Sequence, residues 1–533
     1  MGGTMVGRDT GDAPRTVREV VFGLMRSFGV VTIFGNPGST ELPMLRDMPA
    51  DFRYIMGLQE SVVVGMADGY AQATHRASLV NLHSAPGVGH AMGNIFTAYR
   101  NRTPMVIIAG QQARSMLAGE PYLFSEQASE LPKPYVKWSR EPARAADVPA
   151  AIARAFYVAM APPPGPALVS VPADDWEQPA APVAARTVST ALRPDPQRID
   201  EVGRALARAA RPAFVVGAAV DQDRAFDEVV TLAEAHQARV WAAPLSSRCS
   251  FPELHPLFAG FLPSQREKIV ELLSGHDLVL ALGAPVFSCN VEGSGPYVPE
   301  ETVLYQLIDD ANTAAWTPSG TSVLTSVRLG VRDLLGFVPR VERTPPPGRA
   351  VPARVAASEA ISDAFLMQTL ADLRPADSVI VEEAPSTRPV MCERLPFDRA
   401  ESFYTCASGG LGHSLPAAVG MALAWPSRRV IAVLGDGSSM YSIQALWTAA
   451  QLGDLPITIV VVNNGAYATV RRFAQRLGMD KPVGCDLPGI DFAGLARAQG
   501  CLATRVDSAH QLAAVLKAAL NSPVPHLVDV VVA

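Results

Sequence analysis

Short, uninterrupted runs of apolar residues recur along the chain and restrict its fold more than any other feature. Examples are residues 30–35 (VVTIFG), 278–283 (LVLALG) and 429–435 (RVIAVLG), each separated from the next run by a longer amphipathic stretch. Continuous rather than alternating hydrophobicity is typical of strands covered on both faces, as in parallel sheets between layers of helices. The pattern predicts an α/β protein built from doubly wound parallel sheets.

The predicted strands fall into three groups. Between the groups, residues 174–193 and 340–357 are rich in Pro, Ala and Arg and indicate linkers, since Pro stiffens the chain and removes backbone donors. We therefore expect three domains, at residues 1–185, 195–340 and 358–533. The predicted strands are residues 30–35, 52–56, 78–83, 105–110 and 167–172, then 212–217, 239–244, 278–283 and 303–308, then 378–383, 429–435, 457–463 and 526–532.

Charge and composition point to small-molecule chemistry. The chain has 45 Lys and Arg against 51 Asp and Glu, without a basic run, which argues against a nucleic-acid partner. No apolar run reaches the ~18 residues of a membrane span, and the N-terminus lacks the apolar core of a signal peptide, so we expect a cytoplasmic protein without a membrane partner. The six cysteines are widely spaced without a CxxC pair, which predicts ordinary buried thiols.

The strongest motif lies in the third domain, where Gly435-Asp436-Gly437-Ser438 follows a predicted strand. After 25 residues, from Ser438 to Val462, comes Asn463-Asn464-Gly465. Glycines let a backbone approach phosphate closely, and a helix that begins there presents free N–H groups to an anion. Carboxylate and amide oxygens suit Mg²⁺ bridging a diphosphate. The spacing and the strand context together favour a metal-diphosphate site.

Together, the segments at residues 435–438 and 463–465 resemble the thiamine-diphosphate motif. The resemblance implies that the metal, Mg²⁺ or Ca²⁺, is held by the side chains of Asp436 and Asn464 and by the carbonyl of Ala466. It also implies cofactor contacts from the motif and the residue that follows it, namely Gly435, Asp436, Gly437, Ser438, Asn464 and Tyr467.

Glu60 follows the predicted strand at residues 52–56 and opens an Ala-, Gly- and Val-rich helix. By itself, an acid in a first helical turn is explained by the helix dipole. The thiamine-diphosphate motif changes that interpretation, because enzymes with this cofactor need a carboxylate against its aminopyrimidine ring. Glu60 resembles that residue, in a Gln-Glu context that ends in Ala67-Asp68-Gly69-Tyr70.

Two further polar residues follow predicted strands. His83 could be a satisfied structural histidine at a strand end, or a proton donor, since the same strand end borders the reacting carbon in this superfamily. Ser39, in Asn36-Pro37-Gly38-Ser39, could cap the next helix or offer a hydroxyl to a substrate carboxylate. From the residues alone, both interpretations of Ser39 stay open.

Segments spread over most of the chain extend the likeness, among them GNPGSTELP, FRYIMGLQE, NLHSA, VKWSREPA, GHDLVLALGAPVF and CASGGLG. They resemble the benzoylformate decarboxylase group of the thiamine-diphosphate-dependent 2-oxo acid decarboxylases. The resemblance implies pyrimidine-binding, middle and diphosphate-binding domains, and a homo-oligomer, a dimer of dimers with active sites between subunits. It implies decarboxylation of an aromatic 2-oxo acid to an aldehyde and carbon dioxide, with possible carboligation.

By position in the same resemblance, Glu60, His83 and Ser39 are catalytic. Gly409 supplies a backbone carbonyl to the cofactor, and Leu411 supports its bent shape. The substrate pocket is lined by Ser39, His83, Tyr122, Leu123, Asn290, Thr405 and Phe473.

The chain departs from the group at several of these positions. Asn290 stands where the group has a second catalytic His, and an amide exchanges no proton near neutral pH. His413 is a speculative substitute, although a supporting or surface role is the simpler interpretation. Thr405 replaces an aromatic residue, while Ala384 and Pro385 lie in a loop that is richer in hydroxyls in the group.

Three alternatives remain in view. A carboligase, or a decarboxylase of another 2-oxo acid, would suit slower protonation at Asn290. A nucleotide-binding or structural paralogue without catalysis would not need an acid at Glu60. A dinucleotide dehydrogenase is disfavoured, because no G-x-G-x-x-G follows a predicted strand with an acid ~20 residues on. Whether the middle domain holds a ligand such as a flavin is left open.

Overall fold

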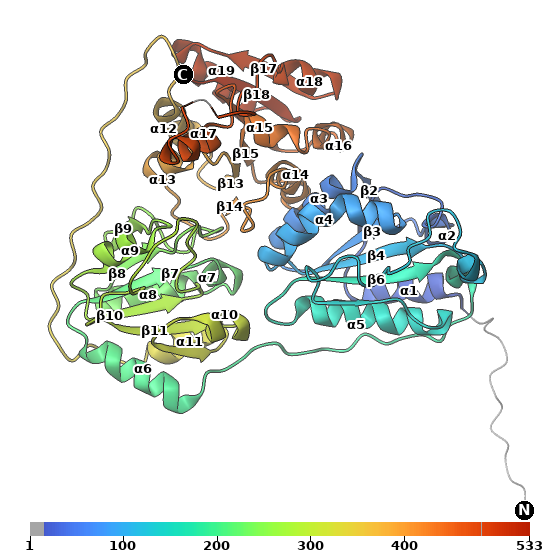
Figure 1. The fold of residues 1–533 in the computed structure, drawn as a ribbon, viewed down its shortest axis with the longest axis horizontal. Coiled ribbons are helices and arrows are strands. Elements are labelled where there is room, and N and C mark those ends of the chain that lie inside the picture. The colour runs from blue at the N-terminus through green and yellow to red at the C-terminus, as the bar shows by residue number, and fades with distance from the viewer. Residues whose placement is uncertain (1–14, 481) are drawn as a thin grey trace, which may run out of the picture. The chain divides into compact units, whose positions relative to one another are not determined.

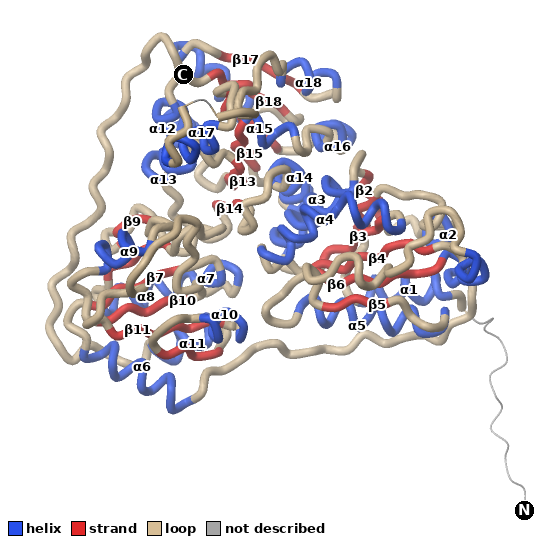
Figure 2. The backbone as a smooth tube through the Cα atoms, viewed as in Figure 1, coloured by secondary structure: helices blue, strands red, loops and turns tan. Residues whose placement is uncertain are grey.

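The computed structural model describes residues 15–480 and 482–533 and contains three six-stranded parallel sheets, each flanked by helices (Figures 1 and 2). This confirms the predicted α/β class with doubly wound sheets. Backbone contacts divide the chain into two compact units. One ends at Val188 and holds the first sheet, and the other, from Ser189 to Ala533 together with Gln72–Thr74, holds the second and third.

The first sheet has the strand order β2-β1-β3-β4-β6-β5. Its central strands are buried on both faces and their side chains are mostly apolar, as β3 and β4 show. The strands are β1 (Thr32–Gly35), β2 (Arg53–Met56), β3 (Ser78–Leu82), β4 (Met105–Gln111), β5 (Trp138–Arg140) and β6 (Pro166–Pro172). The helices are α1 (Val17–Ser27), α2 (Leu42–Leu45), α3 (Glu60–Thr74), α4 (Ser84–Arg100) and α5 (Val148–Met160), with short 3-10 helices at Arg114–Gly119, Ala145–Asp147 and Ala173–Glu177.

The second sheet has the order β12-β11-β10-β7-β8-β9. Its strands are β7 (Pro212–Val216), β8 (Arg239–Ala242), β9 (Phe258–Phe261), β10 (Leu278–Leu282), β11 (Val303–Ile308) and β12 (Thr321–Leu324). Its helices are α6 (Pro196–Arg208), α7 (Ala219–Gln222), α8 (Phe226–His236), α9 (Arg266–Leu273), α10 (Ala311–Trp316) and α11 (Val327–Leu334).

The third sheet has the order β14-β13-β15-β16-β18-β17. Its strands are β13 (Val379–Glu383), β14 (Phe403–Thr405), β15 (Val430–Gly435), β16 (Ile457–Asn463), β17 (Leu502–Val506) and β18 (His526–Val531). Its helices are α12 (Asp363–Leu373), α13 (Arg388–Arg394), α14 (Ser414–Ala424), α15 (Asp436–Met440), α16 (Ala445–Gln451), α17 (Ala468–Arg476), α18 (Phe492–Ala498) and α19 (Ala509–Leu520).

All thirteen predicted strands form, and the described part of the chain contains five further strands where none was expected. These five are β5, β9, β12, β14 and β17, and every one of them is at the edge of its sheet. Edge strands pair on one side only. Several side chains of β17 therefore remain exposed to solvent, whereas β14 is buried but only three residues long. They therefore lack the continuous apolar run by which the central strands were recognised.

The first linker begins later than the sequence suggested. Residues 173–177 form a 3-10 helix in which Trp176 is 1% exposed and packs into the core of the first unit. Asp175 is buried and pairs with Arg114, with Nη2 2.6 Å from Oδ2. The prediction of a linker from residue 174 is therefore wrong for its first residues, because a buried tryptophan and an ion pair attach them to the domain.

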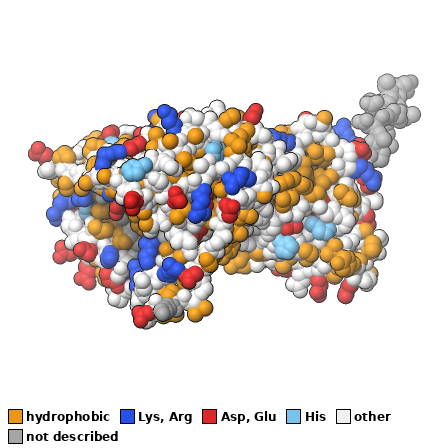
Figure 3. Space-filling view, turned by 90° about the horizontal axis from the view of Figure 1, so that it is seen from above, with side chains coloured by type: hydrophobic (Ala, Val, Ile, Leu, Met, Phe, Trp, Pro, Cys, Tyr) orange, Lys and Arg blue, Asp and Glu red, His pale blue; other side chains and the backbone are white. Residues whose placement is uncertain are grey.

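The thiols differ more than expected. Cys249, Cys485 and Cys501 are buried and Cys392 and Cys406 are half-buried, but Cys289 is exposed, so the prediction of buried thiols is wrong for that residue. On the face shown in Figure 3, basic and acidic side chains are interspersed. Among the residues that the structure describes, no helix is both long enough and apolar enough to cross a membrane.

Candidate active site

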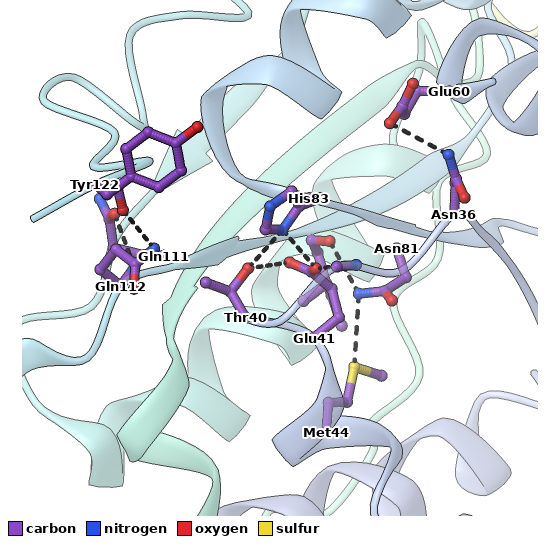
Figure 4. Close-up of polar contacts among 12 residues, drawn as sticks. Asn36, Thr40, Glu41, Met44, Glu60, Asn81, His83, Gln111, Gln112 and Tyr122 are labelled. Carbon is purple, nitrogen blue, oxygen red and sulfur yellow. Dashed lines mark hydrogen bonds and ion pairs between the residues drawn. The ribbon is translucent and has the colours of Figure 1, made fainter.

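The carboxyl ends of three neighbouring strands bring together the predicted polar residues of the first unit. Asn36 follows β1, Glu60 lies just beyond β2, and His83 directly follows β3, and these strands are adjacent in the order β2-β1-β3. Ligands of open parallel sheets bind at this edge. Figure 4 shows the side chains of these loops near one another.

Glu60 is the first residue of α3, and its side chain is only 12% exposed. Asn36 Nδ2 donates to its Oε1 over 3.4 Å (Figure 4), and His90 Nδ1 lies 3.2 Å from its Oε2. The N-cap of the helix is Gln59, whose side chain accepts a hydrogen bond from the backbone N–H of Val62. The helix start is thus capped by another residue, and the Glu60 carboxylate is available to a ligand.

His83 contacts the buried carboxylate of Glu41, a residue that the sequence analysis did not identify. Its Nδ1 lies 2.9 Å from Oε2 of Glu41 and 3.0 Å from Oγ1 of Thr40. The Thr40 hydroxyl donates to Glu41 Oε1 over 2.6 Å, so the hydrogen shared with His83 belongs to the imidazole. Glu41 is 1% exposed and His83 19%. The arrangement assigns a proton to Nδ1 and directs Nε2 toward other partners.

Two glycines make room for this pair. A methyl group on Gly38 would collide with the His83 ring, and one on Gly110, in β4, would collide with Thr40 and Glu41. The backbone N–H of Gly38 also donates to Glu41 Oε2 over 2.8 Å. The sequence signal that could have identified Glu41 is its position directly after Ser39-Thr40, in a loop that already contains a predicted site residue.

Ser39 is exposed, and it is not the cap of the following helix. The N-cap residue of α2 is Glu41, and no side chain caps that helix. The interpretation of Ser39 as a helix cap is therefore wrong. The hydroxyl stands in the loop that carries Asn36 and Glu41, where a ligand carboxylate could be met.

In the third sheet, Asp436 organises the loop that follows β16. Its Oδ2 accepts from the backbone N–H groups of Asn464 (3.1 Å) and Ala466 (3.2 Å), and its Oδ1 accepts from Gly437 (2.7 Å). Burial raises the pKa of Asp436, and these N–H groups oppose that rise. Asp436 thus contacts the backbone of Asn464 and Ala466, and the Asn464 side chain accepts from the Ala466 N–H over 3.1 Å, so the three residues predicted as metal ligands are neighbours.

The same loops fit a diphosphate and a hard cation. Ser438 lies in the first turn of α15, where its backbone N–H has no acceptor within the helix and can meet an anion, whereas the N–H of Gly437 donates to Asp436 Oδ1. A methyl group on Gly437 would collide with the ring of Tyr467, so the glycine allows that ring to close over the turn. Among the described residues no cluster of three or more His, Cys, Asp and Glu side chains could hold a metal.

A second buried carboxylate supports the loop that carries Gly409 and Leu411. Glu383, at the end of β13, accepts from the N–H groups of Gly412 (2.5 Å), His413 (2.9 Å) and Ser414 (2.7 Å). Burial raises its pKa, and these bonds oppose the rise. His413 is 2% exposed, so a surface role for it is excluded, while Leu411 is half-buried and Gly409 exposed.

The predicted pocket residues differ in exposure. Tyr122 is 89% exposed and Phe473 41%, whereas Thr405 is buried. Gln112 donates to the carbonyl of Tyr122 over 2.8 Å, and the neighbouring Leu123 is half-buried. Asn290 is exposed on the middle domain and accepts a hydrogen bond from the Ser264 hydroxyl. In the loop after β13, Ala384 is buried and Pro385 exposed.

The site residues thus form two groups, one in each unit. Ser39, Glu60, His83, Tyr122 and Leu123 belong to the first unit, and the remaining predicted residues belong to the second. Within the second, the loops after β13, β14, β15 and β16 lie at the ends of four adjacent strands.

The chain is similar to known proteins along nearly its whole length. Family models of thiamine pyrophosphate enzymes match in three parts: the N-terminal TPP binding domain at residues 15–130, the central domain at 199–334 and the C-terminal TPP binding domain at 387–530. The benzoylformate decarboxylase of Pseudomonas aeruginosa is 42% identical over 527 residues, which cover 97% of this chain and 98% of that protein.

Two solved structures are similar over nearly their whole length. One is a thiamine diphosphate-dependent 4-hydroxybenzoylformate decarboxylase from Rhodococcus jostii RHA1, with a TM-score of 0.94 and 42% identity, covering 97% of this chain and 99% of that one. The other is a benzoylformate decarboxylase from Polynucleobacter necessarius, with a TM-score of 0.95 and 38% identity, covering 97% and 98% of the two chains.

Proposed function

Because this chain belongs to the thiamine pyrophosphate enzyme family, we propose that it catalyses the thiamine-diphosphate-dependent, non-oxidative decarboxylation of an aromatic 2-oxo acid of the benzoylformate type. The products are carbon dioxide and the corresponding aldehyde, so the enzyme is a carboxy-lyase. The observation that carries the proposal is 42% identity over 97% of the chain to a benzoylformate decarboxylase, in a chain whose Glu60, His83 and Asp436 lie just beyond the carboxyl ends of parallel strands.

The diphosphate end of the cofactor is assigned to the loops after β15 and β16. Asp436, Asn464 and the Ala466 carbonyl would hold a divalent cation, Mg²⁺ or Ca²⁺, since all three donors are hard oxygens. The N–H groups of the first turn of α15 would meet phosphate oxygens. Gly409 and Leu411 would contact the aminopyrimidine end of the cofactor. Their loop is fixed by the hydrogen bonds that Gly412 and His413 donate to Glu383.

When bound, thiamine diphosphate supplies an electron sink for the pair of electrons that carbon dioxide leaves behind. The chain's own residues orient groups and move protons. Glu60 exchanges a proton through Oε1, which is held loosely by Asn36 at 3.4 Å. Ser39 presents its hydroxyl to the substrate carboxylate. His83 delivers a proton from Nε2, because its Nδ1 is engaged by Glu41.

We assign proton delivery to His83 alone, because Asn290 stands where the benzoylformate decarboxylase group has a second catalytic histidine. The Asn290 amide only donates and accepts hydrogen bonds, and its oxygen already accepts from Ser264. Slow protonation would leave more time for capture by a second carbonyl compound. Asn290 therefore also favours carboligation as a second activity of the same site.

A panel of aromatic, branched and linear 2-oxo acids tests the proposal. Each is assayed with thiamine diphosphate and Mg²⁺ for carbon dioxide release, with and without added aldehyde. Benzoylformate and its ring-substituted relatives should have the highest kcat/KM, and Glu60→Gln should abolish turnover of all of them. A linear acid in first place would overturn the substrate class. Acyloin formation faster than aldehyde release would make carboligation the main reaction.

We further propose a homo-oligomer, a dimer of dimers, in which Glu60 of one chain serves the cofactor held by Asp436 of another. Mixing inactive Glu60→Gln and Asp436→Ala chains, followed by dissociation and reassociation, tests this. In a mixed dimer one site carries both changes and the other carries neither, so about a quarter of wild-type activity should return. If both residues served the same chain's cofactor, every mixture would stay inactive.

A further inference from the structure

The Glu60 carboxylate lies against one face of α4, between Gly87 and His90. A methyl group on Gly87 would lie in ordinary van der Waals contact with Glu60, 3.5 Å from Cγ and 3.6 Å from Oε1, so the Glu60 side chain lies close to this face of the helix. His90, three residues later and therefore on the same face of the helix, places Nδ1 3.2 Å from Oε2. The two residues together define where the carboxylate can lie.

The two carboxylate oxygens of Glu60 have different partners. Oε2 lies 3.2 Å from Nδ1 of His90, whereas Oε1 accepts a longer hydrogen bond, of 3.4 Å, from Nδ2 of Asn36. The His90 side chain is 65% exposed and that of Glu60 12%, so a surface histidine contacts a nearly buried carboxylate. A glutamate side chain has three rotatable torsions, and one hydrogen bond at Oε2 restricts them while leaving Oε1 accessible.

We propose that His90 is a positioning residue, which donates a hydrogen bond from Nδ1 to Oε2 of Glu60 and so directs Oε1 toward the aminopyrimidine ring. This inference rests on the proposed function, because it assumes that Glu60 serves thiamine diphosphate. His90 itself touches neither cofactor nor substrate in this role. Its effect is on the rate at which the cofactor loses its reactive proton.

The backbone around Glu60 does not depend on the His90 side chain. Asn94 Nδ2 donates to the Ser61 carbonyl over 2.7 Å, and Gln59 Nε2 donates to the carbonyl of His90 over 3.4 Å. Both contacts join the start of α3 to α4 and survive substitution of the imidazole. A variant at this position should therefore fold and still bind cofactor.

The test compares His90→Leu with His90→Asn. Leucine removes the donor, whereas the asparagine Nδ2 can occupy nearly the same position as the imidazole Nδ1. We measure thiamine diphosphate affinity with Mg²⁺ and the rate of hydrogen–deuterium exchange at C2 of the bound cofactor. Exchange should slow about tenfold in His90→Leu, with unchanged affinity, and should recover in His90→Asn. His510→Leu, an exposed histidine of α19, is the matched control and should exchange like the wild type.

A crystal structure of cofactor-free His90→Leu gives a second readout and should show Glu60 Oε2 displaced from its wild-type position. Equal exchange rates in wild type and His90→Leu would overturn the positioning role, as would a failure of His90→Asn to restore the rate. Absence of cofactor binding by the wild type would instead overturn the proposed function. The two failures are therefore distinguishable.

Discussion

At the scale of single residues, two glutamates in the first unit do different work because their surroundings differ. Glu41 is almost fully buried and is surrounded by donors from Gly38, Thr40 and His83. Glu60 is held at one oxygen and leaves the other accessible. Several hydrogen bonds fix the position of a buried carboxylate, so Glu41 is suited to orienting a neighbouring side chain.

We predict that Glu41→Gln lowers kcat about 100-fold with little change in KM. The amide can present an N–H to His83 Nδ1, which favours the neutral tautomer whose one hydrogen is on Nε2. Release of that hydrogen would leave an imidazolate, so proton delivery from Nε2 is disfavoured. The measurement is steady-state decarboxylation with benzoylformate. Glu130→Gln, an exposed carboxylate in a surface pair with Lys133, is the control. An unchanged kcat would show that His83 does not need this partner.

At the scale of elements, the helices that follow the central strands place the site. Helix α15 starts at Asp436, α3 at Glu60 and α4 directly after His83, so each residue stands where a strand gives way to a helix. Parallel sheets align these junctions at one edge because all their strands point the same way. Close packing between such elements leaves little freedom for larger residues, as at Gly437 and Tyr467.

We predict that Gly437→Ala weakens the binding of thiamine diphosphate and Mg²⁺ by about tenfold or more. The added methyl group collides with the Tyr467 ring, and overpacking of this kind costs about 1–3 kcal/mol. Titration of cofactor against the cofactor-free protein measures the change. Gly23→Ala is the matched control, because a methyl group there meets no atom within 4 Å. Equal loss of affinity in both variants would exclude a local effect.

At the scale of the whole molecule, the second and third sheets are joined by more than chain connectivity. The linker residue Arg343 donates to the carbonyls of Leu206, Ala209 and His236, and farther on Arg349 donates to Cys392. The backbone of Glu253 donates to the Phe397 carbonyl over 2.7 Å, and its carboxyl accepts from the Phe397 N–H over 3.1 Å. Burial raises the pKa of Glu253 to about 8.

We predict that Glu253→Gln makes the protein more stable at alkaline pH. The folded state retains a proton that the unfolded chain releases near pH 4.5, so stability is full below that pH and falls as pH rises through about 8. Glutamine cannot ionise and still accepts from Phe397. The variant and the wild type should melt at similar temperatures at pH 5, and the variant should be more stable by a few kcal/mol, at order of magnitude, at pH 9.

Thermal unfolding followed at both pH values measures this effect. Glu271→Gln, which changes an exposed glutamate of α9, controls for the loss of one negative charge. If the gap between wild type and Glu253→Gln were the same at pH 5 and pH 9, the buried carboxyl would not be the group that titrates.

The amino-acid sequence by itself determined the central strands, the α/β class and the loops that carry Glu60, His83 and Asp436. Each of these features depends on residues close together in the chain, whose apolar runs and turn residues indicate their structure directly. Only the tertiary structure decided that Glu41 lies against His83, 42 positions away, that His90 approaches Glu60, and that five edge strands complete the sheets. Such contacts depend on where folding brings distant segments, and a polar or half-exposed residue shows no local pattern that distinguishes its eventual partner from many other candidates.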